Sequence, residues 1–168
     1  MGSSVRKSSL RTLTLTLCAT LLVAIPVAWA VEGEPTREEY VGRVEPICKT
    51  NTQANSRILK GVKEQVEQGE LVTAGKRFIR ASTALGKAVR QIAAVPKPTA
   101  DAAKLEKWIG YLKQEKTYLQ KIGNALKSKN KFAAQKLAVQ LNRNNNRANN
   151  TVISFGFREC RIDSSNFV

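Results

Sequence analysis

The sequence predicts an all-α fold, an antiparallel up-down-up-down four-helix bundle with one disulfide. Three observations lead to this prediction. Apolar residues recur at helical spacing through four long segments, short polar or proline-containing turns separate these segments, and two cysteines, Cys48 and Cys160, bracket nearly all of them. Helices of similar length that are joined by short turns pack as antiparallel neighbours.

The first thirty residues have the features of an export signal. Three bases precede an uncharged run at residues 12–31, and Ala-Trp-Ala at 28–30 is a small-x-small cleavage site. The alternative is an uncleaved anchor, because an uncharged run of this length is about enough to span a bilayer. Under both interpretations the positive-inside rule places residues 32–168 outside the cytoplasm, either secreted or membrane-anchored through residues 12–31.

The expected domain organisation follows from the signal and the helical pattern. We expect a signal at 1–30, a short helix or linker at 31–45, a four-helix bundle at 46–160 and a tail at 161–168. Without the signal the chain keeps two cysteines, an even number in an oxidising compartment, so we expect a Cys48–Cys160 disulfide. A redox role is less favoured than a structural one because there is no Cys-x-x-Cys motif.

The first helix has a clear start and an uncertain course. Thr36 and Glu39 form a capping box, which predicts a helix N-terminus. Pro46 cannot continue a helix cleanly, so we expect a short helix or a kink there and then a main helix over about 46–68. Cys48 falls on the apolar face of that helix and should point into the core.

The other three helices follow from periodicity and breakers. Helices are predicted over about 70–94, from the Thr99 cap to about 127, and from the Asn130 cap to Gly156. The last of these is rich in asparagine, which has a low helix propensity, but its apolar residues keep helical spacing. All four helices are long enough to form one bundle.

Charge is unevenly distributed along the chain. The net charge is +15, and removal of the signal, which holds three bases and no acid, leaves +12. The predicted second and fourth helices present basic faces made of Lys76, Arg80, Lys87, Arg90, Lys136, Arg143 and Arg147. Such faces suit an anionic envelope polymer, a membrane surface or a protein partner, and the alternative is a surface that only keeps the protein soluble. The aromatic residues are expected to face inward, which argues against specific nucleic-acid binding.

The composition excludes several kinds of chemistry. The chain has no histidine, so imidazole catalysis and imidazole metal sites are absent, and we expect no cofactor and no metal. Glu115 is the one acid placed within an apolar helical face. A buried carboxyl with a raised pKa can serve as a general acid, but pairing with a cation or a hydroxyl across the bundle is the more common arrangement.

Asparagines are a second unusual feature of the predicted core. Asn51 and Asn55 lie within the apolar face of the first helix, and Asn144 and Asn145 lie within or beside that of the last. If the disulfide sets these helices antiparallel, the first pair lies opposite residues 145–153. The amides could fix the register of the helices, or they could line a polar ligand pocket near the disulfide.

Three short motifs resemble those of a group of exported helical proteins from actinobacteria. They are Ile47-Cys48, the Pro-x-Pro connector before Thr99-x-Asp101, and Gly156-Phe157-x-x-Cys160. In that group an I-C and a terminal G-[LF]-x-x-C bracket a helical bundle. The resemblance implies export, the fold and a disulfide, and it implies no activity.

These observations favour an exported, non-enzymatic protein of the cell envelope that binds an anionic polymer, surface or protein partner through its basic helix faces. The alternative is a helical bundle that binds a small ligand in a polar pocket near Asn51, Asn55 and Asn145. An enzyme that uses Glu115 is a distant third possibility.

Overall fold

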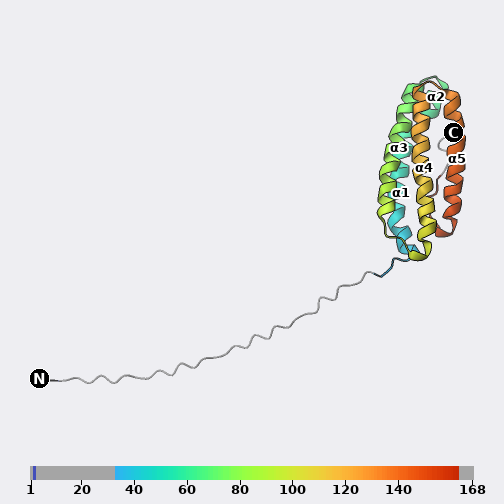
Figure 1. Ribbon diagram of the computed structural model, residues 1–168. Coiled ribbons are helices and arrows are strands. Elements are labelled where there is room, and N and C mark those ends of the chain that lie inside the picture. The colour runs from blue at the N-terminus through green and yellow to red at the C-terminus, as the bar shows by residue number, and fades with distance from the viewer. Residues whose placement is uncertain (1, 3–32, 163–168) are drawn as a thin grey trace. The chain divides into compact units, whose positions relative to one another are not determined.

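The computed structural model describes Gly2 and residues 33–162, and these residues form no strand (Figure 1). The predicted export signal lies outside the described residues. The expected all-α bundle is confirmed. Four long antiparallel helices form it: α1 (Arg37–Leu59), α3 (Leu71–Ala94), α4 (Ala102–Lys127) and α5 (Lys131–Thr151).

Helix α1 begins as predicted but does not stop at the proline. Thr36 and Glu39 form both hydrogen bonds of the capping box. The helix then continues through Pro46, so the domain boundary expected there falls inside one helix. Tyr40 and Val44, at a spacing of four, are fully buried ahead of the proline. Their burial on one face favours a helix on both sides of Pro46, although proline removes one backbone hydrogen bond.

The expected single helix to residue 68 is divided instead into α1 and a short helix, α2 (Val62–Glu67). The break falls at Gly61, whose φ of 76° is in the left-handed region that glycine adopts without steric cost. Helix α2 and the turns on either side of it lie at the end of the bundle opposite the start of α1 (Figure 1). We call that end the α2 end, and the other end the Asp101 end.

Helices α3 and α4 approach each other most closely near the α2 end. A Cβ atom built on Gly75 would lie 2.5 Å from the carbonyl oxygen of Gly123, and one on Gly123 would lie 2.7 Å from the carbonyl oxygen of Gly75. Further along the pair, the Ser82 hydroxyl donates a hydrogen bond to the carbonyl of Lys116 at 2.9 Å. This hydrogen bond fixes the register of the two helices.

The turn into α5 has a side-chain cap, whereas the Thr99 cap expected before α4 does not form, since the start of α4 has no side-chain cap hydrogen bond. A 3₁₀ turn, η1 (Thr99–Asp101), precedes α4, and the Asn130 side chain accepts a hydrogen bond from the Ala133 amide at the start of α5. Helix α5 remains helical through its asparagines and ends in a second 3₁₀ turn, η2 (Ile153–Phe155). Gly156 follows with a φ of 67° and reverses the chain.

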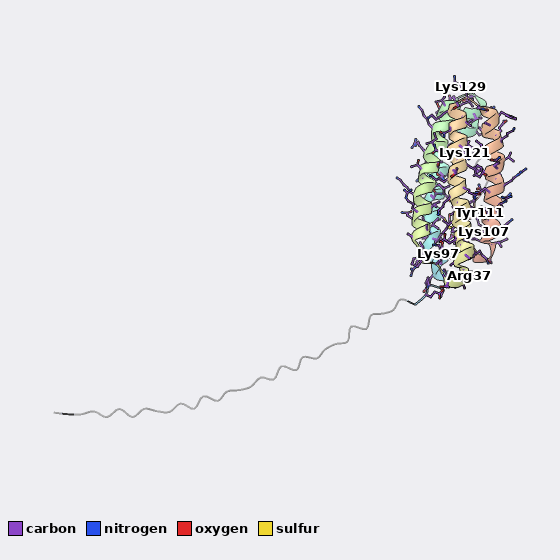
Figure 2. All side chains as sticks on the ribbon, viewed as in Figure 1. Arg37, Lys97, Lys107, Tyr111, Lys121 and Lys129 are labelled. Carbon is purple, nitrogen blue, oxygen red and sulfur yellow. A yellow bond between two sulfur atoms is a disulfide. The ribbon has the colours of Figure 1, made fainter. Side chains whose placement is uncertain are left out.

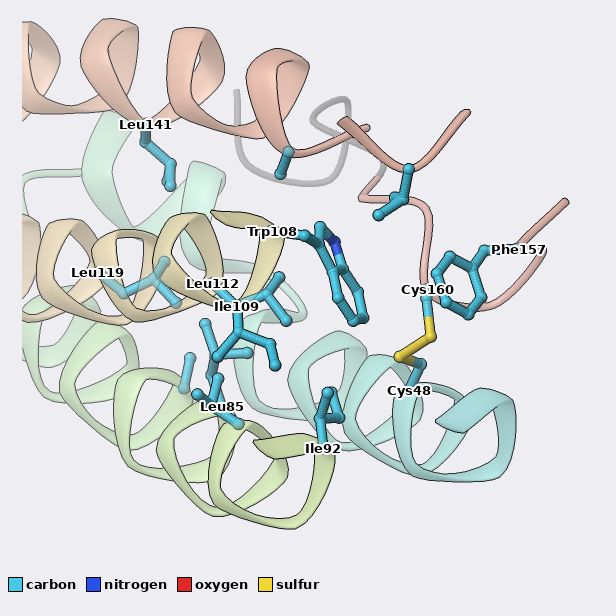
Figure 3. Close-up of a cluster of buried hydrophobic side chains, with 14 of the residues drawn as sticks. Cys48, Leu85, Ile92, Trp108, Ile109, Leu112, Leu119, Leu141, Phe157 and Cys160 are labelled. Carbon is cyan, nitrogen blue, oxygen red and sulfur yellow. A yellow bond between two sulfur atoms is a disulfide. The ribbon is translucent and has the colours of Figure 1, made fainter. Parts of the chain in front are cut away.

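The reversed chain packs on the core at the Asp101 end. The Phe157 ring stacks on Trp108 and on Phe155, with centroids 5.1 Å and 5.6 Å apart. Figure 3 shows the predicted Cys48–Cys160 disulfide beside these rings. Cys48 lies about halfway along α1, not near its start, because α1 begins nine residues before Pro46.

Candidate functional site

After Gly156 the chain folds back between α1 and α5, and we call residues 157–162 the C-terminal segment. The disulfide attaches it to α1, and the Glu45 carboxylate accepts hydrogen bonds from the amides of Arg158 and Glu159, each at 2.9 Å. On the other side, the Asn149 side chain exchanges two 2.9 Å hydrogen bonds with the backbone of Ile162. The segment therefore bridges the two outer helices.

A cavity of about 650 Å³ lies inside the bundle beyond this segment. Helix α1 packs along α3, α3 along α4, and α4 along α5, whereas α1 and α5 form no interface of comparable extent. The space between α1 and α5 is filled in part by the C-terminal segment and continues as the cavity. All the helices of the bundle contribute residues to its wall.

The wall is mostly apolar and runs lengthwise. On α4 it extends from Trp108 to Leu126, which at 1.5 Å per residue is roughly 27 Å. Leu85 and Ile92 of α3 and Leu112 of α4 also belong to it, and Figure 3 shows them converging on one space beside Trp108. Helix α5 contributes two alanines, Ala134 and Ala138, and two longer polar side chains, Lys131 and Gln135. The cavity therefore has the form of an elongated slot.

Glu115 lies on the cavity wall halfway along α4. It is only 4% exposed, and its carboxyl group has no hydrogen bond or ion pair with any described residue. Burial raises the pKa of Glu115 from 4.5 to about 8, because an apolar surrounding disfavours the charged form. The sequence favoured a cation or a hydroxyl that pairs with Glu115 across the bundle, and no described residue makes that pair.

Other buried polar groups lie at similar heights in the bundle. The Arg37–Asp101 ion pair, at 2.7 Å, holds the starts of α1 and α4 at the same height along the bundle. Asn51 on α1 and Glu115 on α4 each lie fourteen residues further along from this pair. The Ser82–Lys116 hydrogen bond brings α3 to the same height. The side-chain oxygens of Asn51 and Asn55 and the indole nitrogen of Trp108 have no hydrogen-bond partner. We call Asn51, Asn55 and Glu115 the polar belt of the cavity.

The four candidate asparagines divide into two pairs. Asn51 and Asn55 line the cavity, as the pocket hypothesis required. Asn144 and Asn145 are buried but do not line it, since the Asn144 amide donates to the carbonyl of Tyr111 at 3.0 Å and so joins α5 to α4. The first pair faces residues 134–138 of α5 across the cavity and not the expected 145–153, because the chain reverses at Gly156 before it reaches Cys160.

All seven basic candidates are exposed and form no ion pair with a described residue. They lie in two rows on α3 and α5, on either side of α4: Lys76, Arg80, Lys87, Arg90, Lys136, Arg143 and Arg147. Figure 2 shows further bases along the outside of α4, with Lys107 and Lys121 labelled. The described surface therefore carries a broad positive charge.

The expectation that aromatic residues face inward fails at one position. Phe132, at the start of α5, is 66% exposed, and the Lys136 ammonium lies 4.3 Å from the centre of its ring. Val139, about two helical turns after Phe132, is also exposed. No larger aromatic surface accompanies this pair among the described residues, because Trp108, Phe155 and Phe157 are buried.

The sequence predicted a polar pocket near the disulfide only as the alternative, and the long apolar wall of the cavity was not predicted, although a signal for it exists. Between Cys48 and Ile58 the inner face of α1 carries polar residues, of which Asn51 and Asn55 are two, and no large apolar one. Opposite them stand the alanines of α5. Small and polar residues on two facing helices leave space that neither helix fills.

A scan against protein-family models and searches of curated proteins and of solved structures find no match to this chain. The disulfide indicates an oxidising environment. Among residues 33–162, no helix combines the length and the apolar character that a membrane crossing requires.

Proposed function

We propose that the protein binds an elongated, mainly apolar small molecule inside its helical bundle and acts outside the cytoplasm as a binding protein. The observation that supports this proposal is the cavity of about 650 Å³, whose apolar wall extends along most of α4. Its volume is within the range of small-molecule sites, and such sites combine an apolar wall with a few polar groups. The polar belt provides those groups.

Energetics favour an occupant. The cavity is partly open to solvent, so water fills it when no ligand is bound, and most of its wall is apolar. Water can satisfy the polar belt, but it gains nothing from Leu85, Leu112 or Ile122 on the wall. An apolar molecule that contacts these residues stabilises the folded chain.

The charges on the wall favour binding over catalysis. Glu115 is the one ionisable residue on the part of the wall that the helices α1, α3 and α4 contribute. No hydrogen bond or ion pair joins Glu115 to another described residue, so no partner group orients its carboxyl for proton transfer. We therefore include no reaction in the proposal.

The test is a titration with N-phenyl-1-naphthylamine, a neutral probe that becomes fluorescent in apolar sites. We expect saturable binding at one site. Ala138→Phe places a ring in the cavity and should weaken binding at least tenfold, whereas Ala133→Phe, on the same helix but away from the wall, should not. Absence of saturable binding, or equal affinities in the two variants, would contradict the proposal.

A second function is supported by a separate observation, the seven exposed bases that have no ion pair with a described residue. Two such rows can bind a polyanion or an anionic surface of the envelope through charge alone. The two functions use different surfaces, the inside and the outside of the bundle, so one chain can perform both. A salt series with charge-reversed variants, described below, tests this candidate.

A further inference from the structure

The cavity holds a carboxyl group without a counter-ion. Along the wall, α1 contributes Asn51, Asn55 and two hydroxyl residues, and α3 contributes only apolar residues, so neither helix faces Glu115 with a charge. Charged groups line only the ends of the cavity. At the α2 end these are Lys60, Lys63, Glu64, Glu67 and Lys131, and at the other end they are Glu159 and Arg161.

None of these end groups contributes to the perturbation of Glu115, which burial alone causes. The bases at the α2 end are also exposed to water. No described residue therefore supplies a cation for the ionised form of Glu115, and such a cation would have to come from the molecule that occupies the cavity.

The neighbouring polar atoms also favour a particular ligand. The unpartnered oxygens of Asn51 and Asn55 are hydrogen-bond acceptors, as is an ionised carboxylate. The unpartnered Trp108 indole N–H is a donor, but it lies seven residues before Glu115, roughly 10 Å along α4, and so outside the polar belt. An alkylammonium group presents three N–H donors in a compact volume, which suits three acceptors on two facing helices. A carboxylate headgroup would instead add acceptors to acceptors and place a negative charge beside Glu115.

We infer that the ligand is an amphiphilic amine, with its hydrocarbon chain along the apolar wall and its ammonium group on Glu115 and the Asn51 and Asn55 oxygens. The inference rests on the proposed function, because it names the ligand class of the same cavity. When an R–NH₃⁺ group binds, the neutral Glu115 acid releases its proton to solvent and the resulting carboxylate pairs with the ammonium. One proton is thus released for each amine bound below the pKa of Glu115.

The energetics of this exchange are favourable near neutral pH. Because the pKa of Glu115 is about 8, ionising it at pH 7 costs only about a factor of ten in affinity. An ion pair in an apolar cavity is much stronger than one in water, and a charge-assisted hydrogen bond adds to it. At pH 6 the cost of ionisation rises to about a hundredfold, which gives the inference a clear pH signature.

The experiment compares decylamine, decanol and decanoate by calorimetry with the full exported chain at pH 6 and pH 8. We expect decylamine to bind roughly 50-fold more tightly at pH 8 than at pH 6, with one proton released at pH 6, and decanol to show no such dependence. In Glu115→Gln the dependence and the preference for the amine should disappear while decanol still binds. The proton release of the unmodified protein tests the inference even if that variant does not fold.

The outcomes distinguish the inference from the proposed function. Equal binding of amine and alcohol at pH 8, tighter binding of decanoate, or an unchanged amine preference in Glu115→Gln would overturn the inference and leave the apolar site in place. Failure of all three compounds to bind would overturn both.

Discussion

The Arg37 guanidinium donates two hydrogen bonds to the Asp101 carboxylate, at 2.7 Å and 2.8 Å, and so joins the first residue of α1 to the turn before α4. Both helices run in the same direction from this pair. The pair thereby places Asn51 and Glu115 at the same height on opposite walls of the cavity. The polar belt lies about 20 Å along the helices from this ion pair.

The same ion pair predicts a local change in acidity. Hydrogen bonds from Arg37 hold the pKa of Asp101 below its usual value of 3.8. In Arg37→Ala that pKa should return toward or above 3.8, as measured by carboxyl NMR titration. The stability that Asp101 contributes is present above pH 3.8 and is lost as the pH falls through its lowered pKa. The free energies of unfolding of the wild type and of Arg37→Ala should therefore converge in acid. Arg43→Ala, an exposed base without an ion pair in the described residues, is the control.

Glu115 predicts the opposite pH dependence. Its pKa is raised to about 8 in the folded state, so the contribution of Glu115 to stability is most favourable below pH 4.5, where it is protonated in both states, and becomes less favourable as the pH rises to about 8. Glu115→Gln removes this loss. Between pH 5 and pH 9 the free energy of unfolding of the wild type should fall by about 3 to 5 kcal/mol relative to the variant. If the free energies of unfolding from urea denaturation changed in parallel with pH in the two proteins, the burial of a neutral acid at Glu115 would be contradicted.

The close contact of α3 and α4 predicts a contrast between glycines. Gly75→Ala and Gly123→Ala would each press a methyl group onto backbone atoms of the facing helix, and each should cost about 1–3 kcal/mol of stability. At Gly110, also on α4, no atom lies within 4 Å of an added Cβ. Gly110→Ala should therefore raise stability by up to about 1 kcal/mol, because alanine favours helix. Equal effects at the three positions in thermal unfolding would contradict the close approach.

Removal of the disulfide should lower the stability of the protein without changing its fold class. Its two cysteines are 112 residues apart, and the entropy of a loop of this length corresponds to about 4–5 kcal/mol. Cys48→Ser with Cys160→Ser should remove that amount and keep the far-ultraviolet dichroism of a helical protein. Alkylation of the exported wild-type protein without reduction should modify neither cysteine. Free thiols at both positions would contradict the bridge.

The basic faces predict salt-sensitive binding. Retention of the protein on heparin or on its own envelope fraction should fall linearly with the logarithm of salt concentration. Arg143→Glu with Arg147→Glu should reduce the slope by about 4, because each reversal loses one contact and adds one repulsion. Arg43→Glu with Lys49→Glu makes the same change in net charge on exposed positions of α1 and is the control. Equal effects of the two pairs would mean that net charge, and not the rows, controls retention.

Sequence reasoning recovered the features that depend on local pattern. The helices of the bundle follow from apolar spacing, the start of α1 from Thr36 and Glu39, and the disulfide from an even cysteine count after an export signal. Pro46 misled the prediction because the buried residues before it keep the segment helical. Gly61 was the real break, and only its left-handed φ distinguishes it from other helical glycines.

The candidate site was only partly predictable, for a physical reason. Periodicity identifies the inward face of each helix, and it correctly marked Glu115, Asn51 and Asn55 as unusual inward residues. It does not give the distance between facing helices. That distance is set here by the C-terminal segment, which separates α1 from α5, and by the alanines of α5, which do not fill the space.

The measurement that tests the central proposal most directly is photo-crosslinking with a decyl chain that carries a diazirine, mapped to single residues by mass spectrometry. The account predicts labels on the cavity wall, at Leu85, Leu112 and Ile122, and their loss in Ala138→Phe but not in Ala133→Phe. Labels confined to the exposed apolar residues Phe132, Val139 and Ile153 would contradict it. That result would place apolar binding on the outside of the bundle.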